Sequence, residues 1–373
     1  MVRLQTSNAG TSAEALVLAS LRGILDRVAN FIKVTDKGDF PARPPSDVIA
    51  DILTLPDPGF PWLRGFSEAP VFLPSGCLLN QPGHDVESGL FLTLNGLESV
   101  RSDIPVQEAV SLLQDELLRD FPFADQGSKA HVIALLLLPF CRHLISGATP
   151  LFLVDAPTRG TGKSLLVGVV AGISLGRPAH VMTLPSEEDE LDKRITATLI
   201  QGSPMVLLDN VVSLKSTALS AVLTATSWEG RRLGKSEMVV APNTATWIAT
   251  GNNVTFSDEM VRRTVHIRLD AGVERPEERN GFRYPDLMTW VRSNRVSLVS
   301  ACLSIIQVWI DAGMPNGRDT LGGFERWAEV MGGILEVVGI EGFLTNREAL
   351  YSEADPETRE WIGLCEAWWD QFG

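Results

Sequence analysis

The segment Leu151-Phe-Leu-Val-Asp-Ala-Pro-Thr-Arg-Gly-Thr-Gly-Lys-Ser-Leu-Leu166 leads from an apolar run through a loop into a helical pattern. Residues 151–155 have the length and composition of a buried strand. Gly160 and Gly162 permit the tight turns of a loop, and the pattern from Lys163 to Leu175 predicts a helix. A strand, a glycine-containing loop and a helix in this order indicate a parallel sheet covered by helices.

The same loop carries residues that suit the binding of nucleotide phosphates. Glycines let backbone N–H groups turn inward around phosphate oxygens, and the first turn of the helix adds partial positive charge. We expect Lys163 to reach the β- and γ-phosphates of ATP and the hydroxyl of Ser164 to bind Mg²⁺. The predicted nucleotide-binding residues are Gly160, Thr161, Gly162, Lys163, Ser164 and Leu165.

One position departs from the strict phosphate-loop pattern Gly-x-x-x-x-Gly-Lys-Ser, which has glycine where this chain has Pro157. Proline has no N–H to donate, so the first turn of the loop must differ from the usual one. The alternative is a chance match in a loop rich in small residues. The strand before the loop and the helix after it argue against chance.

Downstream of the loop, short apolar runs alternate with helical patterns. We expect further strands at 180–184, 204–209, 238–241, 245–251 and 265–269, and helices at 186–201, 216–228 and 257–263. The predicted fold class is therefore α/β, with a parallel-sheet P-loop core over residues 125–270.

Two further regions flank this core. Residues 1–124 are interrupted by proline and glycine and predict an α+β region, with strands at 71–73 and 89–94 and a helix at 106–120. Residues 271–373 predict a helical region rich in tryptophan. We expect its tryptophans to anchor packing rather than to stack on bases; they are Trp290, Trp309, Trp327, Trp361, Trp368 and Trp369.

A second candidate part of the site is the end of the strand Pro204-Met-Val-Leu-Leu-Asp209. A carboxylate here is placed to hold Mg²⁺, although an ordinary acidic strand end would look the same. A motor ATPase normally has glutamate next, to orient the attacking water, but this chain has Asn210, which cannot act as a base. Glu190, in the acidic run from Glu187 to Arg194, is our candidate for that role, and a solvated helix face explains the run equally well.

The strand Thr246-Trp-Ile-Ala-Thr-Gly-Asn252-Asn253 ends in two amides. The side chain of Asn252 could bind the γ-phosphate and its attacking water. The alternative is that Asn252 and Asn253 only form a turn, because Gly-Asn-Asn is favourable turn chemistry.

Paired arginines follow in Asp258-Glu-Met-Val-Arg262-Arg263. Arg262 or Arg263 could reach the nucleotide of a neighbouring subunit and stabilise the transferring phosphate. Both could instead be surface residues, or pair with Asp258 or Glu259.

The bulk composition restricts the class of protein. The net charge of −14 excludes a surface that is basic throughout, so any nucleic-acid contact must be local. Four scattered cysteines form no CxxC pair, which favours a reducing compartment over a disulfide or zinc framework. We read no signal peptide, and the apolar runs 132–140 and 165–175 are too short to cross a bilayer. We therefore expect a cytoplasmic protein of a bacterial cell, without a membrane partner.

The order of these motifs resembles that of the AAA+ (ASCE-type) ring ATPases, and specifically the superfamily-three helicases of phages, viruses and plasmids. Three stretches are similar to the helicase half of primase–helicase proteins from prophages and integrative elements, namely Trp228–Gly234, Ala249–Asn253 and Arg262–Asp270. Weaker similarity continues through Gly76–Asp85 and Trp368–Gly373. The resemblance covers most of the chain and is strongest over residues 150–270.

This resemblance implies a homo-hexameric, ATP- and Mg²⁺-dependent DNA helicase or translocase that acts in replication of a phage or mobile element. It implies ATP between subunits, an arginine acting in trans, single-stranded DNA in a central pore, and a primase or primase domain as partner. In such helicases a hairpin lines the pore; here it would span about 229–243 and carry Arg231, Arg232 and Lys235. Arg231 could instead sense the nucleotide, and the cluster could be a solvated turn.

Two other functions fit the residues less well. A nucleotide-gated DNA-loading or assembly ATPase would tolerate slow hydrolysis, and Asn210 favours it. A small-molecule P-loop kinase would be a monomer and would need no arginine from a neighbour.

Overall fold

The structure is a computed structural model of the 373-residue chain, and it describes residues 2–7, 10–57, 59–231, 238–354, 361, 364–365, 368–369 and 371–372. The chain forms two compact units. The smaller comprises residues 1–66 and 84–91, and the larger comprises residues 67–83 and 92–373.

The smaller unit is built from two hairpins, two helices and short strands. Its elements are β1 (Val2–Ser7), β2 (Gly10–Ala15), α1 (Leu18–Val28), β3 (Phe31–Thr35), β4 (Gly38–Ala42), α2 (Ser46–Thr54), β5 (Gly65–Ser67), β8 (Gly83–His84) and β9 (Leu90–Leu92). Strands β1 and β2 pair antiparallel, as do β3 and β4. Leu21 of α1 and Ile49 of α2 are its buried aliphatic anchors. The sequence predicted only the strand near β9, because the alternating patterns of these hairpins are short.

The larger unit is organised around a five-stranded parallel sheet. Its strands are β10 (Leu151–Ala156), β11 (His180–Met182), β12 (Met205–Leu214), β15 (Thr246–Phe256) and β16 (Thr264–Arg268). They lie in the order β11-β12-β15-β10-β16. Strand β15 therefore lies between β10 and β12, although it follows both in sequence. This confirms the predicted α/β class.

Helices and short strands complete this unit. They are β6 (Val71–Phe72), β7 (Leu78–Leu79), α3 (Val106–Ser111), the π-helix η1 (Leu112–Leu117), α4 (Gln126–Cys141), the 3₁₀ turn η2 (Arg142–Leu144), α5 (Lys163–Ser174), α6 (Glu188–Ile200), α7 (Thr217–Thr224), β13 (Ser227–Arg231), β14 (Met238–Pro242), α8 (Asp258–Val261), the 3₁₀ turn η3 (Pro276–Glu278), α9 (Leu287–Ser293), α10 (Arg295–Asp311), α11 (Glu325–Val337) and α12 (Arg347–Ala354). Side chains of Asp125, Ser216 and Ser257 accept hydrogen bonds at the first turns of α4, α7 and α8, which explains where these helices begin.

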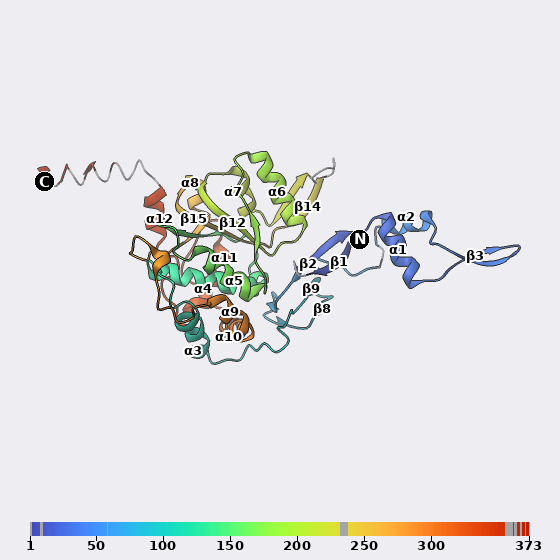
Figure 1. Cartoon of the computed structure of the whole chain (residues 1–373), viewed down its shortest axis with the longest axis horizontal. Coiled ribbons are helices and arrows are strands. Elements are labelled where there is room, and N and C mark those ends of the chain that lie inside the picture. Colours follow the sequence, from blue (N-terminus) through green and yellow to red (C-terminus); the bar gives the residue numbers. More distant parts are fainter. Residues whose placement is uncertain are drawn as a thin grey trace. The chain divides into compact units, whose positions relative to one another are not determined.

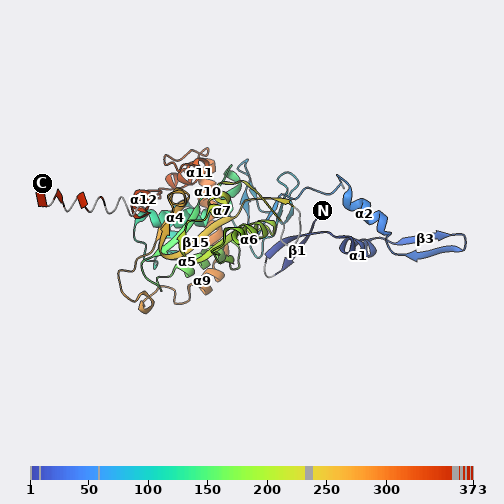
Figure 2. The same cartoon turned by 90° about the horizontal axis from the view of Figure 1, so that it is seen from above.

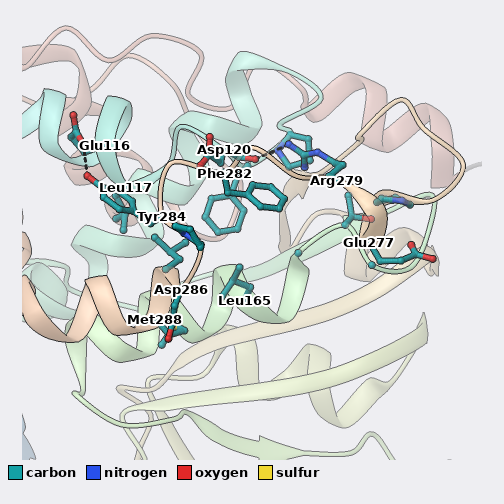
Figure 3. A pocket seen from close by; sticks show the side chains of 18 residues that line it. Glu116, Leu117, Asp120, Leu165, Glu277, Arg279, Phe282, Tyr284, Asp286 and Met288 are labelled. Atoms are coloured by element: carbon teal, nitrogen blue, oxygen red, sulfur yellow. Dashed lines mark hydrogen bonds between the residues drawn. The ribbon is translucent and has the colours of Figure 1, made fainter.

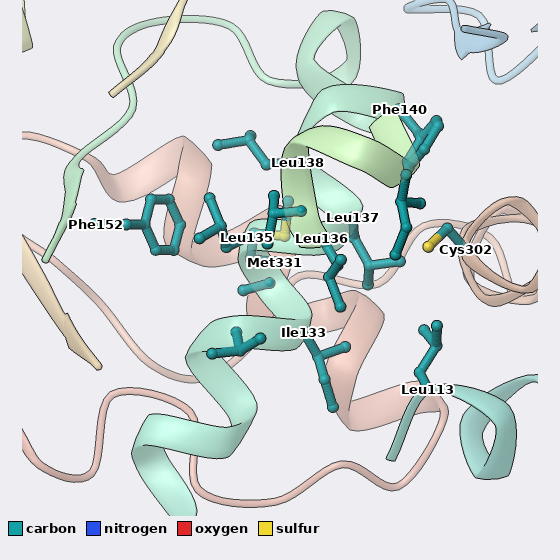
Figure 4. Close-up of a cluster of buried hydrophobic side chains, with 14 of the residues drawn as sticks. Leu113, Ile133, Leu135, Leu136, Leu137, Leu138, Phe140, Phe152, Cys302 and Met331 are labelled. Atoms are coloured by element: carbon teal, nitrogen blue, oxygen red, sulfur yellow. The ribbon is translucent and has the colours of Figure 1, made fainter. Parts of the chain in front are cut away.

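The sheet separates two hydrophobic cores, because alternate residues of each strand point to opposite faces. Phe152 and Val154 of β10 pack on one face with α4, α5, α10 and α11. Leu151 and Leu153 pack on the other face with α6, α7 and α8. Figure 1 shows α6 and α7 on one side of β12 and β15, with α5 and α10 on the other, and Figure 2 gives the view from above. Figure 4 shows the first core around Leu135, Phe152 and Met331.

Three of the predicted elements need correction. Residues 227–231 are strand β13, so the helix expected at 216–228 ends at Thr224. Strand β14 pairs antiparallel with β13 and is not part of the parallel sheet. The helix expected at 106–120 is α-helical only to Ser111 and continues as a π-helix to Leu117. Tertiary pairing overrides helical propensity in the first case, since Trp228 donates a 2.9 Å hydrogen bond to Thr196 of α6.

The tryptophans divide into two groups. Trp309 and Trp327 are buried, and Trp290 stacks on Tyr284 with 4.3 Å between ring centroids, so the prediction of packing anchors is confirmed for these three. Trp361, Trp368 and Trp369 are exposed, and the prediction is wrong for them. The domain boundaries expected near residues 124 and 270 stay a prediction.

Among the described residues, none of the helices taken singly has the length and apolar composition needed to span a membrane. The bent pair of α9 and α10, with 73° between the two helices, passes that test when the pair is taken together. Most of α10 is buried in the first core.

A buried histidine ties α4 to the sheet and to the C-terminal region. The backbone N–H of Leu344 donates to Nε2 of His131 at 3.0 Å, so we assign the ring proton to Nδ1, which donates to the carbonyl oxygen of His266 at 2.7 Å. Burial lowers the pKa of His131 to about 4, and the bond to His266 opposes this shift only in part.

We predict that His131 makes the free energy of unfolding fall as the medium is acidified. Its pKa in the folded chain lies below that of the unfolded chain, so protons bind the unfolded chain preferentially once the pH falls below about 6.5. Between pH 7 and pH 5 this histidine accounts for a loss of about 2 kcal/mol. Urea unfolding at the two pH values measures the effect. His131→Gln should show a pH dependence smaller by that amount, and an unchanged dependence would contradict the assignment.

Candidate functional site

The loop between β10 and α5 contains two residues in left-handed backbone conformations. Gly160 has φ +75° and Gly162, at the N-cap of α5, has φ +101°. A Cβ atom on Gly160 would lie 2.7 Å from Oε2 and 3.2 Å from the backbone nitrogen of Glu277. Glycine is the only residue that fits position 160 without strain, because φ is positive there and a Cβ would clash with Glu277.

Lys163 lies at the first position of α5, and its side chain returns over the loop. Its Nζ is 3.4 Å from the carbonyl oxygen of Thr158, which also accepts the hydroxyl of Thr161 at 2.7 Å. Partial burial lowers the pKa of Lys163, Arg159 adds to the shift, and Asp155 opposes it. A phosphate bound to this ammonium would supply an opposite charge, which favours the charged form of Lys163 and offsets the cost of its partial burial.

The two amides at the end of β15 hold the start of the loop. Asn252 Nδ2 donates to the carbonyl oxygen of Ala156 at 3.1 Å, and Asn253 Nδ2 donates to that of Pro157 at 3.4 Å. Strand β15 continues to Phe256, but its register against β12 shifts between Val211 and Ser213 and Asn253 has φ +47°, so the two amides lie in an irregular, turn-like part of the strand. Pro157 lacks an N–H, but its carbonyl takes part in the loop's hydrogen bonding.

Asp209 is oriented by a residue of the neighbouring strand. The hydroxyl of Thr250 donates to Asp209 Oδ1 at 2.6 Å and accepts the backbone N–H of Asn210 at 3.0 Å. No donor among the described residues reaches Oδ2 of Asp209. This oxygen is therefore available to an external cation. The sequence contained Thr250 but no pattern that would assign it this contact.

The register of β12 against β15 changes between Leu208 and Val211. Asn210 has φ +56° in this bulge, a conformation that asparagine tolerates better than most residues. Gly251 lies opposite, and a Cβ there would lie 2.5 Å from the carbonyl oxygen of Val211. Glutamate at position 210 would incur about 1–2 kcal/mol of strain, so the bulge gives a physical reason for the missing acid.

Glu190 forms an ion pair with Arg194, 2.9 Å away and one turn along α6. Helix α6 packs against α7, β13 and β14. The role of Glu190 as a base stays a prediction. Its ion pair with Arg194 fits the alternative, a solvated helix face.

A charged cluster that the sequence analysis did not identify lies beside the loop. Arg268 at the end of β16 forms an ion pair with Asp155 of β10 and donates to Asn253 Oδ1 at 3.1 Å. His266 Nε2 is 3.6 Å from the same carboxylate. Oδ1 of Asp155 is buried without a hydrogen-bond partner among the described residues. Arg268 lies in the stretch Arg262–Asp270 that carries the family resemblance, but nothing in that stretch assigned it a contact with Asp155.

The structure distinguishes the two paired arginines. Arg263 donates to the carbonyl oxygen of Glu259 at 2.8 Å and forms a 3.0 Å ion pair with its carboxylate, which agrees with the ion-pair alternative. Arg262 is exposed at the end of α8. Of the two, Arg262 is the side chain available to a neighbouring subunit.

The predicted DNA-binding cluster is only partly described. Arg231 is the last residue of β13 and is exposed, whereas Arg232 and Lys235 lie outside the described residues. Strands β13 and β14 pair antiparallel from Ser227↔Pro242 to Arg231↔Met238. The hairpin expected at about 229–243 is thus present, and its contact with DNA stays a prediction.

A cavity of about 350 Å³ opens beside the loop (Figure 3). Gly160, Gly162 and Leu165 lie on one side of it. Residues 116–122 and 276–288 line the remainder. A molecule bound by the loop could therefore extend into a partly enclosed space.

The residues near the loop fit a magnesium ion shared with phosphate oxygens. In the part of the chain that the structure describes, no three His, Cys, Asp or Glu side chains gather as metal ligands. Mg²⁺ needs no such group, since it is usually held by one or two protein oxygens together with water and phosphate. Asp209 Oδ2 and the exposed hydroxyl of Ser164 are suitable donors.

No protein-family model matches the chain, and no curated protein matches its sequence. Among solved structures, the apo C-terminal region of NrS-1 is 14% identical, over 90% of this chain and 74% of that chain, with a TM-score of 0.45. A structure of JCV helicase is 14% identical, over 70% of this chain and 76% of that chain, with a TM-score of 0.28. Identities and TM-scores this low leave the function to be inferred from the site itself.

We predict that Thr250→Val lowers the free energy of unfolding by about 1–2 kcal/mol, because it removes two hydrogen bonds at Asp209 and Asn210. Thr250→Ser should lose less, since it keeps the hydroxyl. Urea unfolding measures both. Thr255→Val is the matched control, because Thr255 is an exposed threonine of the same strand. Equal effects of Thr250→Val and Thr255→Val would show that the contact with Asp209 does not matter.

Proposed function

We propose that this chain is an ATP-dependent, ring-forming DNA helicase or translocase that acts in the replication of a phage or mobile genetic element. One observation carries the nucleotide part of the proposal. The adjacent parallel strands β15 and β12 bring Asn252 and Asp209 level with the carboxyl end of β10, where the glycine loop begins, because Asn252 is in register with Ala156 and Thr250 binds Asp209. Ligands of open parallel sheets bind at the edge where the carboxyl ends of the strands lie.

Each part has a chemical role in the proposed mechanism. N–H groups of the loop and Lys163 bind the phosphates of ATP, and Ser164 with Asp209 would hold Mg²⁺, which neutralises charge on the phosphate oxygens. Asn252, whose amide donates to Ala156, would sense the γ-phosphate and orient water. Thr250, which donates to Asp209 Oδ1, would hold that carboxylate in position for the metal.

The ring part of the proposal rests on the paired arginines and the hairpin. Arg262 would complete the nucleotide site of the adjoining subunit in a homo-hexamer. Arg231, with Arg232 and Lys235, would contact single-stranded DNA in the central pore, giving an acidic protein a local basic surface. A primase or primase domain is the expected partner.

We predict that Lys163→Ala weakens the binding of Mg·ATP by about 10- to 150-fold, because hydrogen bonds to charged groups contribute about 1.5–3 kcal/mol. ATP-dependent strand displacement should be lost. Lys193→Ala, at an exposed lysine of α6, is the matched control. A Lys163→Ala protein that binds and unwinds as well as the parent would rule out the motor.

The proposed role of Arg262 in trans is tested by mixing two inactive variants. Lys163→Ala inactivates a subunit's own site, whereas Arg262→Ala inactivates the site of its neighbour. Mixed rings contain interfaces with both residues intact, so we predict that mixing restores part of the ATP hydrolysis that neither variant shows alone. Arg263→Ala should retain hydrolysis, since its ion pair lies within its own subunit. No recovery on mixing would contradict the assignment.

Asn210 favours a second candidate function, a nucleotide-gated loading or assembly ATPase. The bulge leaves no acid directly after Asp209, so hydrolysis would be slow unless another residue supplies the base. Single-turnover measurement of ATP hydrolysis with DNA decides between the two functions. ATP turnover too slow to support translocation along DNA would select the loading function.

A further inference from the structure

The cavity beside the glycine loop indicates how a bound nucleotide would be recognised. If the loop binds phosphates, the nucleoside must leave the loop past the first turn of α5, where the cavity begins at Gly162 and Leu165. Its volume of about 350 Å³ lies within the usual range of ligand pockets. The nucleoside would therefore occupy this cavity.

Three aromatic residues line the cavity; Tyr284 stacks on Trp290, and Phe121 and Phe282, with several aliphatic groups, form the wall on which a base would lie. Phe121 comes within 3.7 Å of where a Cβ of Gly162 would stand, and Phe282 approaches from the segment 276–288. Figure 3 shows Phe282 above Leu165 of α5, with Met288 further along the cavity. Aromatic and aliphatic faces hold any base by stacking and burial.

Most polar side chains of the cavity are engaged with other parts of the protein; the exception is Glu277, whose carboxylate lies against Gly160 of the loop. Glu116 accepts hydrogen bonds from Arg283 at 2.7 Å and from the hydroxyl of Tyr284 at 2.6 Å. Asp286 accepts the backbone N–H and the hydroxyl of Thr289, at 2.9 and 2.6 Å. These carboxylates shape the segment that carries Phe282 and are not directed to a ligand.

Two other polar groups are engaged in the same way. Asp120 Oδ2 accepts the backbone N–H of Arg283 at 2.7 Å, and the hydroxyl of Thr161 donates to Thr158. Arg279 donates to the carbonyl oxygen of Asp120 at 3.0 Å and lies over the ring of Phe282, 5.4 Å from its centroid. No asparagine or glutamine lines the cavity, and Arg279, a residue type that can read guanine, is engaged by Asp120 and Phe282.

We propose that the base is held by stacking on Phe121 and Phe282 without being read at its hydrogen-bonding edge, so that the protein uses ATP and GTP almost equally. The inference rests on the proposed nucleotide-binding function of the loop. Discrimination of 10⁴-fold or more requires buried polar groups that are left unpaired by the wrong ligand, whereas an apolar pocket discriminates by about 100-fold at most. We therefore expect ATP and GTP to bind with Kd values within about tenfold of each other.

The test measures Kd values of ATP and GTP for the full chain with Mg²⁺, by competition with a fluorescent ADP derivative. Kd values within about tenfold support the inference, and a preference for ATP above about 100-fold overturns it while leaving the nucleotide site intact. Failure of both nucleotides to bind overturns the proposed function itself.

A substitution in the cavity wall tests whether the base binds there, independently of nucleotide selectivity. Phe282→Ala should weaken the binding of ATP and of GTP by a similar factor, about tenfold, because stacking is tolerant of base identity. Phe60→Ala, at an exposed phenylalanine of the smaller unit, is the matched control and should change neither. If Phe282→Ala weakens the binding of only one nucleotide, or of neither, the inference is overturned.

Discussion

The hydrogen bonds made by residues 250–253 of β15 are the constraint on which the site depends. Asn252 and Asn253 hold the carbonyl groups of Ala156 and Pro157 on one side, and Thr250 holds Asp209 on the other. Because β15 lies between β10 and β12, it contacts both the start of the glycine loop and Asp209. A change in β15 would therefore be felt by both halves of the site.

The same constraint accounts for the residues that depart from a usual motor ATPase. The bulge that lets β12 follow β15 places Asn210 in a left-handed conformation and requires glycine at position 251. The loop begins with Pro157, but the amide of Asn253 anchors its carbonyl group. Both departures are thus matched by contacts of β15, and neither lies among residues 160–165. In the proposed mechanism their effect would fall on hydrolysis, since no acid follows Asp209.

Charge at this edge of the sheet is arranged in pairs that involve the nearest strands. Arg268 links Asp155 to Asn253, and Lys163 remains partly desolvated beside the loop. Strand β16, which carries Arg268, begins directly after Arg263, so one short strand connects the loop to Arg262, the exposed arginine that we propose acts on a neighbouring subunit. This connection offers a physical route from an occupied nucleotide site to the proposed subunit boundary.

The amino-acid sequence by itself determined the local elements of the core. The strand at 151–155, the helix from Lys163, and the starts of the strands that carry Asp209 and Asn252 were predicted within one residue, because apolar runs and glycines act over short distances, but β12 and β15 each continue five residues past the expected end. Tertiary contacts set the strand order, the pairing of Thr250 with Asp209, the ion pair that separates Arg263 from Arg262, and the pairing of β14 with β13 outside the parallel sheet. These depend on which strands become neighbours, and residues far apart in the chain carry no local pattern that states their pairing.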